Sequence, residues 1–396
     1  MKIYLSENRI VLSIISLAFV YTFLYFPLLG WNAYVLSSIF CMAIVITYTL
    51  TNIDTVIRLK KYWYLNILAC VYYLSVLISR TVNGQLSVFA FVTLTFNCFI
   101  FPFIELQREK GHSNFLYKSF LVIYGICLVF NDILMVVFPG RFYGDGFSKN
   151  FLIGNKFHVS YNHMVFLFLY CVLFSTVKKY SKWIPFMFIL TACICFYVDC
   201  RTAMLGTFVA FIVYKSPDLV FKKLNTNSVV LFAVILCAMF VFFSQIAKLP
   251  SVKYFITEVL GRDVTLTGRQ QIFEVLPKVI RRKPWLGYGS SSKIISHYTG
   301  AYDAQNGFFD LVVSNGIPSA VIYVILLVSL VKKSSAASSK ILLGGIYAYI
   351  VMSMVEITYS STLLLLGILL FTESLAYKNN DVRLVDVNSS VRVQIW

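Results

Sequence analysis

The sequence contains one long polar segment, from about residue 244 to residue 310, which includes TGRQQIFEVLPKVIRRKPWLGYG (residues 267–289) and leads into AQNGFFDLVVSNGIP (residues 304–318). A dozen apolar runs surround this segment, and 59% of the 396 residues are hydrophobic. Only 13% of the residues are charged, about half the share of roughly 25% that is typical of soluble domains. The chain is therefore predicted to lie in a membrane, with this polar segment facing water.

The apolar runs are mostly about 16 to 22 residues long, which lets a helix cross a hydrocarbon core of ~30 Å. Open strands would leave backbone groups unsatisfied in lipid, so helices are the expected spanning structure. The first run resembles a signal peptide but lacks a small-residue cleavage site, so we interpret it as a retained span. We predict an all-α polytopic membrane protein with about 12 transmembrane helices, at residues 10–29, 33–50, 64–79, 87–104, 120–138, 159–177, 184–200, 202–214, 228–246, 311–330, 341–356 and 360–377.

Basic residues are concentrated in alternate connections between these spans. If both termini are cytoplasmic, the cytoplasmic segments hold 20 of the 34 Lys and Arg residues, and every short loop then agrees with the positive-inside rule. We divide the chain into an N-terminal membrane bundle of about nine spans at 1–246, an extracytoplasmic loop at 247–310, C-terminal spans at 311–377 and a cytoplasmic tail at 378–396.

The remaining basic residues are predicted to lie on the outer face, against the topological bias. Nine of them are in the long polar segment, and the others include Arg80, Arg141, Lys156 and Arg201. Basic groups kept on this face suggest that an anion is bound there. Contact with lipid headgroups is the alternative interpretation.

A short amphipathic helix is predicted to begin at Thr267 in the long loop. Gln270 follows Thr267 by three residues, as in a capping box, and apolar residues then recur at helical spacing until Pro284. The basic residues near its end suit the helix dipole and need no ligand. Arg269 in the first turn opposes the dipole, so an anion shared with the N-terminal amides is the better explanation for it.

Arg201 is the second candidate for an anion-binding residue. It lies in Asp199-Cys200-Arg201-Thr202, at a predicted tight turn between two apolar runs. A charge at the edge of the hydrocarbon region is costly unless it is paired or functional. Two interpretations remain open, namely an ion pair with Asp199 and a guanidinium that binds a phosphate in bidentate fashion.

Several of these motifs together resemble the O-antigen ligase and polymerase superfamily of bacterial surface-polysaccharide assembly. The resemblance rests on Arg269, on Pro-Trp-Leu-Gly-Tyr-Gly at 284–289, on Gln-Asn-Gly-Phe at 305–308 and on Asn-Gly-Ile at 315–317. Cys-Arg-Thr at 200–202 is similar to the Ser-Arg-Thr turn of this family, and Gly-Asn-Lys at 154–156 to an element of capsule-type polymerases. Gln305 stands where ligases have His and cannot serve as a general base, which favours the polymerase branch.

The resemblance implies a GT-C-like integral-membrane glycosyltransferase in the bacterial cytoplasmic (inner) membrane. Its activity would be to polymerise oligosaccharide repeat units, each carried on undecaprenyl diphosphate, into O-antigen or capsular polysaccharide. No cofactor and no metal are expected, because the sequence has no Asp-x-Asp motif. The implied partners are lipid-linked glycans, membrane lipids and a chain-length regulator, with no nucleic acid.

The resemblance also implies roles for individual residues. Arg269 and Arg201 are assigned to the diphosphate and the charge of the transition state, and the acid or base is open among His297, Asp303 and Glu274. The predicted substrate-binding residues are Arg141, Gln305, Asn306 and Tyr288. The alternatives are a ligase that transfers finished glycan to an acceptor, and a transporter or flippase of lipid-linked oligosaccharide, against which the nearly charge-free spans argue.

Overall fold

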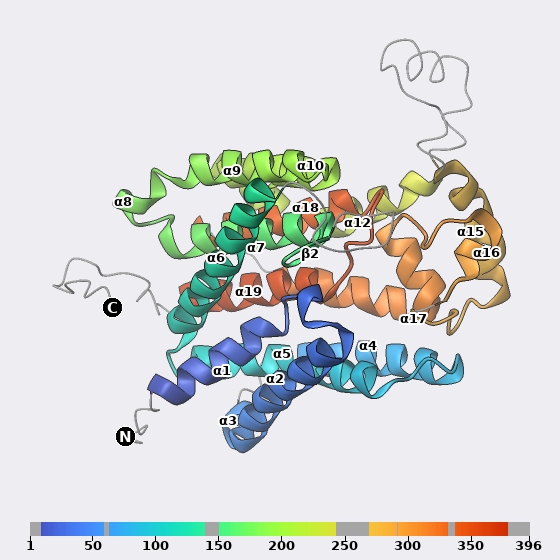
Figure 1. Ribbon diagram of the computed structural model, residues 1–396, viewed down its shortest axis with the longest axis horizontal. Coiled ribbons are helices and arrows are strands. Elements are labelled where there is room, and N and C mark those ends of the chain that lie inside the picture. The colour runs from blue at the N-terminus through green and yellow to red at the C-terminus, as the bar shows by residue number, and fades with distance from the viewer. Residues whose placement is uncertain are drawn as a thin grey trace, which may run out of the picture.

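The computed structural model describes residues 9–58, 63–138, 150–242, 269–290, 292–331 and 337–378. These residues are almost entirely helical, and Figure 1 shows long helices that lie side by side in a bundle. The described strands are β1 (Asn150–Phe151) and β2 (Gly154–Asn155), which pair in antiparallel fashion. The predicted all-α polytopic class is therefore confirmed.

A helix is present in each of the twelve predicted spans. Seven of the helices in the described ranges, or eight if the bent α11–α12 pair counts as one span, are long and apolar enough to cross a membrane, so the count of twelve spans stays a prediction. The twelve helices are α1 (Arg9–Tyr21), α2 (Trp31–Thr51), α4 (Trp63–Val82), α5 (Val88–Glu109), α6 (Ser113–Val137), α7 (Lys156–Phe174), α9 (Ile184–Tyr197), α10 (Arg201–Lys215), α12 (Asn227–Met239), α17 (Gly307–Leu330), α18 (Ala337–Met352) and α19 (Ser361–Lys378).

The first predicted span, 10–29, is longer than the helix found there. Helix α1 ends at Tyr21, and the Thr22 hydroxyl donates a hydrogen bond back to the carbonyl oxygen of Phe19 at 2.6 Å. Pro27 then opens a single 3₁₀ turn, η1 (Pro27–Leu29), since the first turn of a helix tolerates a residue that lacks an N–H. Gly30, with φ of 73°, leads into α2.

Shorter elements connect the long helices. The α15 and α16 helices lie at one end of the bundle and α8 lies at the opposite end (Figure 1). These connecting elements are α3 (Ile53–Arg58), α8 (Lys178–Ser181), α11 (Asp218–Leu224), η3 (Phe240–Phe242), α15 (Arg269–Arg282) and α16 (Ile294–Thr299).

The outer faces of the long helices are apolar. On α6, large exposed side chains recur three or four residues apart and form a continuous stripe, made of Val122, Ile126, Val129, Ile133 and Val136. A contiguous apolar surface of this extent is rare on a soluble monomer. It is the surface expected of a helix that faces lipid.

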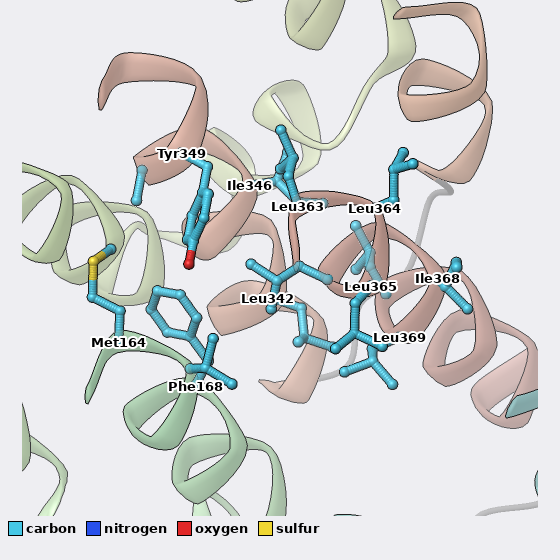
Figure 2. Packing of buried hydrophobic residues seen from close by; sticks show 14 of the residues in the cluster. Met164, Phe168, Leu342, Ile346, Tyr349, Leu363, Leu364, Leu365, Ile368 and Leu369 are labelled. Carbon is cyan, nitrogen blue, oxygen red and sulfur yellow. The ribbon is translucent and has the colours of Figure 1, made fainter. Parts of the chain in front are cut away.

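Helices α18 and α19 form part of the buried core. Figure 2 shows Met164 and Phe168 of α7 beside Tyr349 of α18, and the leucines of α19 beside Leu342 and Ile346 of α18. The α10 and α18 helices come unusually close, since a Cβ at Gly344 would lie 2.8 Å from the carbonyl oxygen of Ala210. Small residues at a helix crossing permit this close approach in membranes, where packing drives association.

Contacts at or beside the six connections predicted to be extracytoplasmic link these connections in two groups of three. The first connection contacts the third through Tyr25 and His158, and the third contacts the fourth through Lys156 and Asp199. The second connection contacts the long loop through Asn83 and Lys283, and the long loop contacts the last connection through Arg269 and Glu356. These connections therefore assemble one end of the bundle, where the predicted site residues lie.

Candidate active site

The Pro-Trp-Leu-Gly-Tyr-Gly motif at 284–289 lies against a break in α17. At Gly316 the φ and ψ angles are 86° and 165°, which interrupts the helix. The backbone N–H groups of Tyr288 and Gly289 donate to the carbonyl oxygens of Val313 and Ser314, each at 2.8 Å. The N–H of Ile317 donates to the carbonyl oxygen of Pro284, also at 2.8 Å. The motif at 284–289 and the Asn-Gly-Ile motif at 315–317 therefore lie against each other and are joined by backbone hydrogen bonds.

This contact requires glycine on both sides. A Cβ at Gly287 would lie 2.6 Å from the carbonyl oxygen of Val313, and one at Gly316 would lie 2.1 Å from that of Trp285. Both residues also have positive φ angles, which glycine adopts without steric cost. The Ser79 hydroxyl on α4 donates to the Leu286 carbonyl oxygen at 2.5 Å. These contacts fix the segment that follows α15 to the bundle.

Helix α15 covers the stretch in which an amphipathic helix was predicted. Its apolar residues Ile272, Phe273, Leu276 and Val279 are buried, in a cluster that also contains Val313 of α17. Thr267, the predicted cap, lies outside the described residues, so the capping box stays a prediction. The burial of this face leaves Arg269, the first residue of α15, directed to the interior.

Arg269 contacts the connection between α18 and α19, at residues 353–360. One guanidinium nitrogen, Nη2, donates to the carbonyl oxygen of Val355 at 3.3 Å and lies 3.5 Å from a carboxylate oxygen of Glu356. The two side chains are only 22% and 15% exposed. Arg269 and Glu356 therefore form a partly buried ion pair, at the end of the bundle where the outer connections meet.

Sequence reasoning missed Glu356, because the predicted span 341–356 included it as the last residue of an apolar run. Burial raises the pKa of its carboxyl to about 6, an effect that outweighs the opposing influence of Arg269. The nearby Asp303 raises this pKa further, and Lys156 lowers it. A carboxylate at the very end of an apolar run was the available signal, since burying such a charge is costly.

The connection at 353–360 also anchors the start of α17. The side-chain amide of Asn306 donates to the carbonyl oxygens of Met354 and Cys237, each at 3.2 Å, and its oxygen accepts from the N–H of Phe309. The N–H of Gly307 donates to the Ser353 carbonyl oxygen at 2.8 Å. Asn306 is completely buried and caps α17. The fold thus uses the polar atoms of this predicted substrate-binding residue.

Gln305 and Asp303 form a compact turn before α17. The carboxylate oxygen Oδ1 of Asp303 accepts from the backbone N–H of Gln305 at 2.9 Å and from its side-chain amide at 2.8 Å. The backbone of Gln305 has a φ of 49°, which is uncommon for a residue with a side chain. Gln305 therefore binds the carboxylate that also acts on Glu356.

The two motifs around Arg201 and Lys156 meet at Asp199. The Arg201 guanidinium lies 3.5 Å from the Asp199 carboxylate, and the Lys156 ammonium donates to the Asp199 carbonyl oxygen at 3.3 Å. Asn155 places Lys156 by capping α7, since its side-chain oxygen accepts from the N–H groups of Phe157 and His158. The predicted pair of Arg201 with Asp199 exists, with side chains 65% and 75% exposed. Such exposed pairs contribute about 0–1 kcal/mol, so the guanidinium remains available to a stronger anion.

The remaining residues predicted to take part in catalysis or substrate binding are His297, Glu274, Tyr288 and Arg141. His297, on α16, is exposed and its ring packs edge-on against Tyr298. Glu274 is exposed on α15 and accepts from the Gln270 amide at 3.0 Å. The Tyr288 hydroxyl donates to the Val279 carbonyl oxygen at 3.1 Å, and Arg141 lies outside the described residues.

The basic cluster at the end of α15 has local partners. The Arg282 guanidinium donates to the Tyr298 hydroxyl, and Lys278 lies over the same ring at 5.7 Å. The Lys283 ammonium donates to the Asn83 side-chain oxygen at 2.9 Å. These contacts support the structural interpretation of the cluster, in contrast to Arg269.

The intramembrane carboxylate Asp132 on α6 is also paired. Its oxygen lies 3.1 Å from Nε2 of His163 on α7, whose other ring nitrogen contacts the Val159 carbonyl oxygen at 2.8 Å. This contact joins α6 to α7. The polar side chains of Asp132 and His163 thus bind each other inside the bundle.

Comparison with known families identifies the part of the chain that carries this site. Residues 186–324 match the O-antigen ligase family. The superfamily resemblance expected from the motifs is thereby confirmed. No curated protein and no solved structure matches the chain.

The matched domain runs from α9 into α17 and contains Arg201, Arg269 and the contact between 284–289 and Gly316. Lys156 and Glu356 lie on either side of the domain in the sequence, and both approach it in space. The site is thus completed by residues from outside the matched region.

The backbone contact of the domain can be tested by replacing Gly316 with Ala. The change forces a side chain into a conformation that is nearly exclusive to glycine, which costs on the order of 1–3 kcal/mol, and adds a clash with Trp285. We expect a clear drop in the midpoint of thermal unfolding in detergent, followed by the fluorescence of the purified protein. Gly300→Ala is the control, because Gly300 has a similar φ of 74° with nothing within 4 Å. Equal midpoints for the two variants would contradict the close backbone contact.

Proposed function

We propose that this protein polymerises lipid-linked oligosaccharide repeat units into O-antigen or capsular polysaccharide. The observation that carries the proposal is the gathering of Arg201, Lys156, Arg269 and Glu356 at one end of the bundle, around a domain that matches the O-antigen ligases. The site would face the extracytoplasmic side, as the distribution of basic residues in short loops predicts.

The proposed reaction displaces a lipid diphosphate from a glycan chain. A hydroxyl of the acceptor repeat unit attacks the anomeric carbon of the donor, a new C–O bond forms, and the bond from that carbon to the diphosphate oxygen breaks. The leaving diphosphate takes the bonding electrons, so negative charge develops on it. Arg269 and Arg201 are proposed to stabilise this charge, since fixed cations are effective where charge develops in the transition state.

The acceptor hydroxyl must lose its proton, and Glu356 is the best-placed group to take it. Its carboxylate is partly buried and lies 3.5 Å from the guanidinium assigned to the diphosphate. His297 and Glu274 are exposed instead, and the Asp303 carboxylate already accepts two hydrogen bonds from Gln305. A pKa near 6 suits a base at neutral pH.

A ligase that transfers finished glycan to another acceptor is the second candidate, favoured by the description of the matching family. Gln305 supports the polymerase instead, because its amide cannot take a proton and is engaged by Asp303. A flippase is a third possibility, which the nearly charge-free spans disfavour.

The proposed function is tested by the glycans of a strain that lacks the protein. For a polymerase we expect single repeat units at the surface with no ladder of longer chains on a gel, because only elongation is lost. Lipid-linked intermediates are extracted in parallel. Full-length polymer stranded on the lipid carrier would indicate a ligase, and repeat units trapped on the cytoplasmic side would indicate a flippase.

The two arginines can be tested in the same strain by complementation. Arg201→Ala and Arg269→Ala should each reduce chain elongation by ~100-fold or more, the order of loss seen when one group that stabilises transition-state charge is removed. Arg281→Ala is the control, because Arg281 is exposed at the far end of α15. Membrane fractions are blotted to show equal insertion. A normal ladder in both variants would disprove the assignment.

The base can be tested by the pH dependence of polymer formation with purified protein. Because burial raises the pKa of Glu356 to about 6, its carboxyl takes up a proton as the pH falls through that value and can no longer accept one from the acceptor. We expect kcat/KM to fall tenfold per pH unit below about pH 6 and to be level above it. The groups that act on this carboxyl are Arg269, Asp303 and Lys156.

Glu356→Gln provides the matching variant, since it keeps the size of the side chain and removes the base. It should lower kcat strongly and abolish the change in rate near pH 6, while the unfolding midpoint stays close to that of the native protein. If the variant keeps the native pH profile, Glu356 does not supply the base.

A further inference from the structure

An apolar groove of about 440 Å³ lies between α9 and α10. Its walls are side chains of both helices, and all but Thr207 are apolar. Several of them are largely exposed, with Ile189 at 61%, Leu205 at 50% and Phe208 at 59%. The residues used below are Phe188, Ile189 and Ala192 of α9 and Met204, Leu205 and Phe208 of α10.

A cation lies on the α10 face that lines this groove. Arg201 precedes Met204, Leu205 and Phe208 by three, four and seven residues, the spacing that places side chains on one face of a helix. At ~1.5 Å per residue, the stripe from Arg201 to Phe208 is ~10 Å long. One helix face therefore carries a guanidinium at its outer end and apolar side chains below it.

Further charges connect this end of the groove to the candidate active site. Asp199 contacts both Arg201 and Lys156, and the charge of Lys156 acts on Glu356, which pairs with Arg269. A ligand with one phosphate would need only one of these cations. A diphosphate carries more negative charge and spans more than one cation, which matches the presence of both Arg201 and Lys156 beside Asp199.

We infer that the groove between α9 and α10 binds the first isoprene units of a polyisoprenyl diphosphate, with the diphosphate at Arg201 and Lys156. This inference rests on the proposed function and adds which helices receive the lipid of the donor. The tail of the leaving group would then lie between α9 and α10 and its diphosphate at Arg201 and Lys156, on the side that faces Arg269. The acceptor sugar would approach from the side of Glu356 and Asp303.

The test measures binding to the full-length protein in nanodiscs, with a C55 isoprenyl diphosphate and with inorganic diphosphate as separate probes. Ala192→Trp fills the groove and should weaken binding of the C55 probe on the order of tenfold, as expected when apolar contact area is lost, with inorganic diphosphate unaffected. Arg201→Ala should weaken both probes. Val122→Trp is the control, because it adds the same indole to the exposed face of α6.

A photoreactive isoprenyl diphosphate is crosslinked to the native protein as a second measurement, which does not depend on the folding of any variant. Crosslinks on α9 and α10 that excess phosphatidylglycerol does not suppress are expected. Crosslinks on other helices, or equal competition by phosphatidylglycerol, would overturn the inference while binding of the C55 probe stays intact. If the native protein binds no isoprenyl diphosphate at all, the proposed function itself fails.

Discussion

The rest of the structure depends on how the backbone is satisfied where α17 breaks. Within a membrane protein, the carbonyl and N–H groups freed by a break must find partners in the protein, because lipid offers none. The segment at 284–289 provides them, through hydrogen bonds to Val313, Ser314 and Ile317. The same segment holds α15 against the bundle, so the position of Arg269 follows from a requirement of the backbone.

Two opposing effects act on the charges gathered at this end. Burial disfavours the ionised form of Glu356, whereas the guanidinium of Arg269 favours it. Burial is the larger of the two effects. The exposed pair of Arg201 with Asp199 has the opposite character, because water screens it and little free energy is lost when it opens. One arginine is therefore fixed by a partly buried partner, and the other can change partners cheaply.

Much of the fold was predictable because hydrophobic runs and turn residues are local signals. The helices α9 and α10, with Arg201 at the turn between them, lie where the pattern placed them. The early end of α1 was not predicted, because the aromatic residues that follow Tyr21 kept the run apolar. Glu356 was missed for a different reason, since its importance comes from a contact with Arg269 that spans a large separation in sequence. The role of Asn306 was also misjudged, because a motif identifies a residue without showing whether its side chain is used for a ligand or for a cap.

The position of Glu356 in the last connection of the described chain has a consequence for biosynthesis. Arg269 and the break in α17 are made before α18 and α19, whereas the carboxylate that neutralises Arg269 arrives only with that final helical hairpin. Until the hairpin inserts, the half-made protein lacks the Glu356 carboxylate that contacts Arg269 and the carbonyl oxygens of Met354 and Ser353 that accept hydrogen bonds from Asn306 and Gly307. Insertion of α18 and α19 therefore adds the acidic partner of Arg269 and the backbone partners of the start of α17 in a single step.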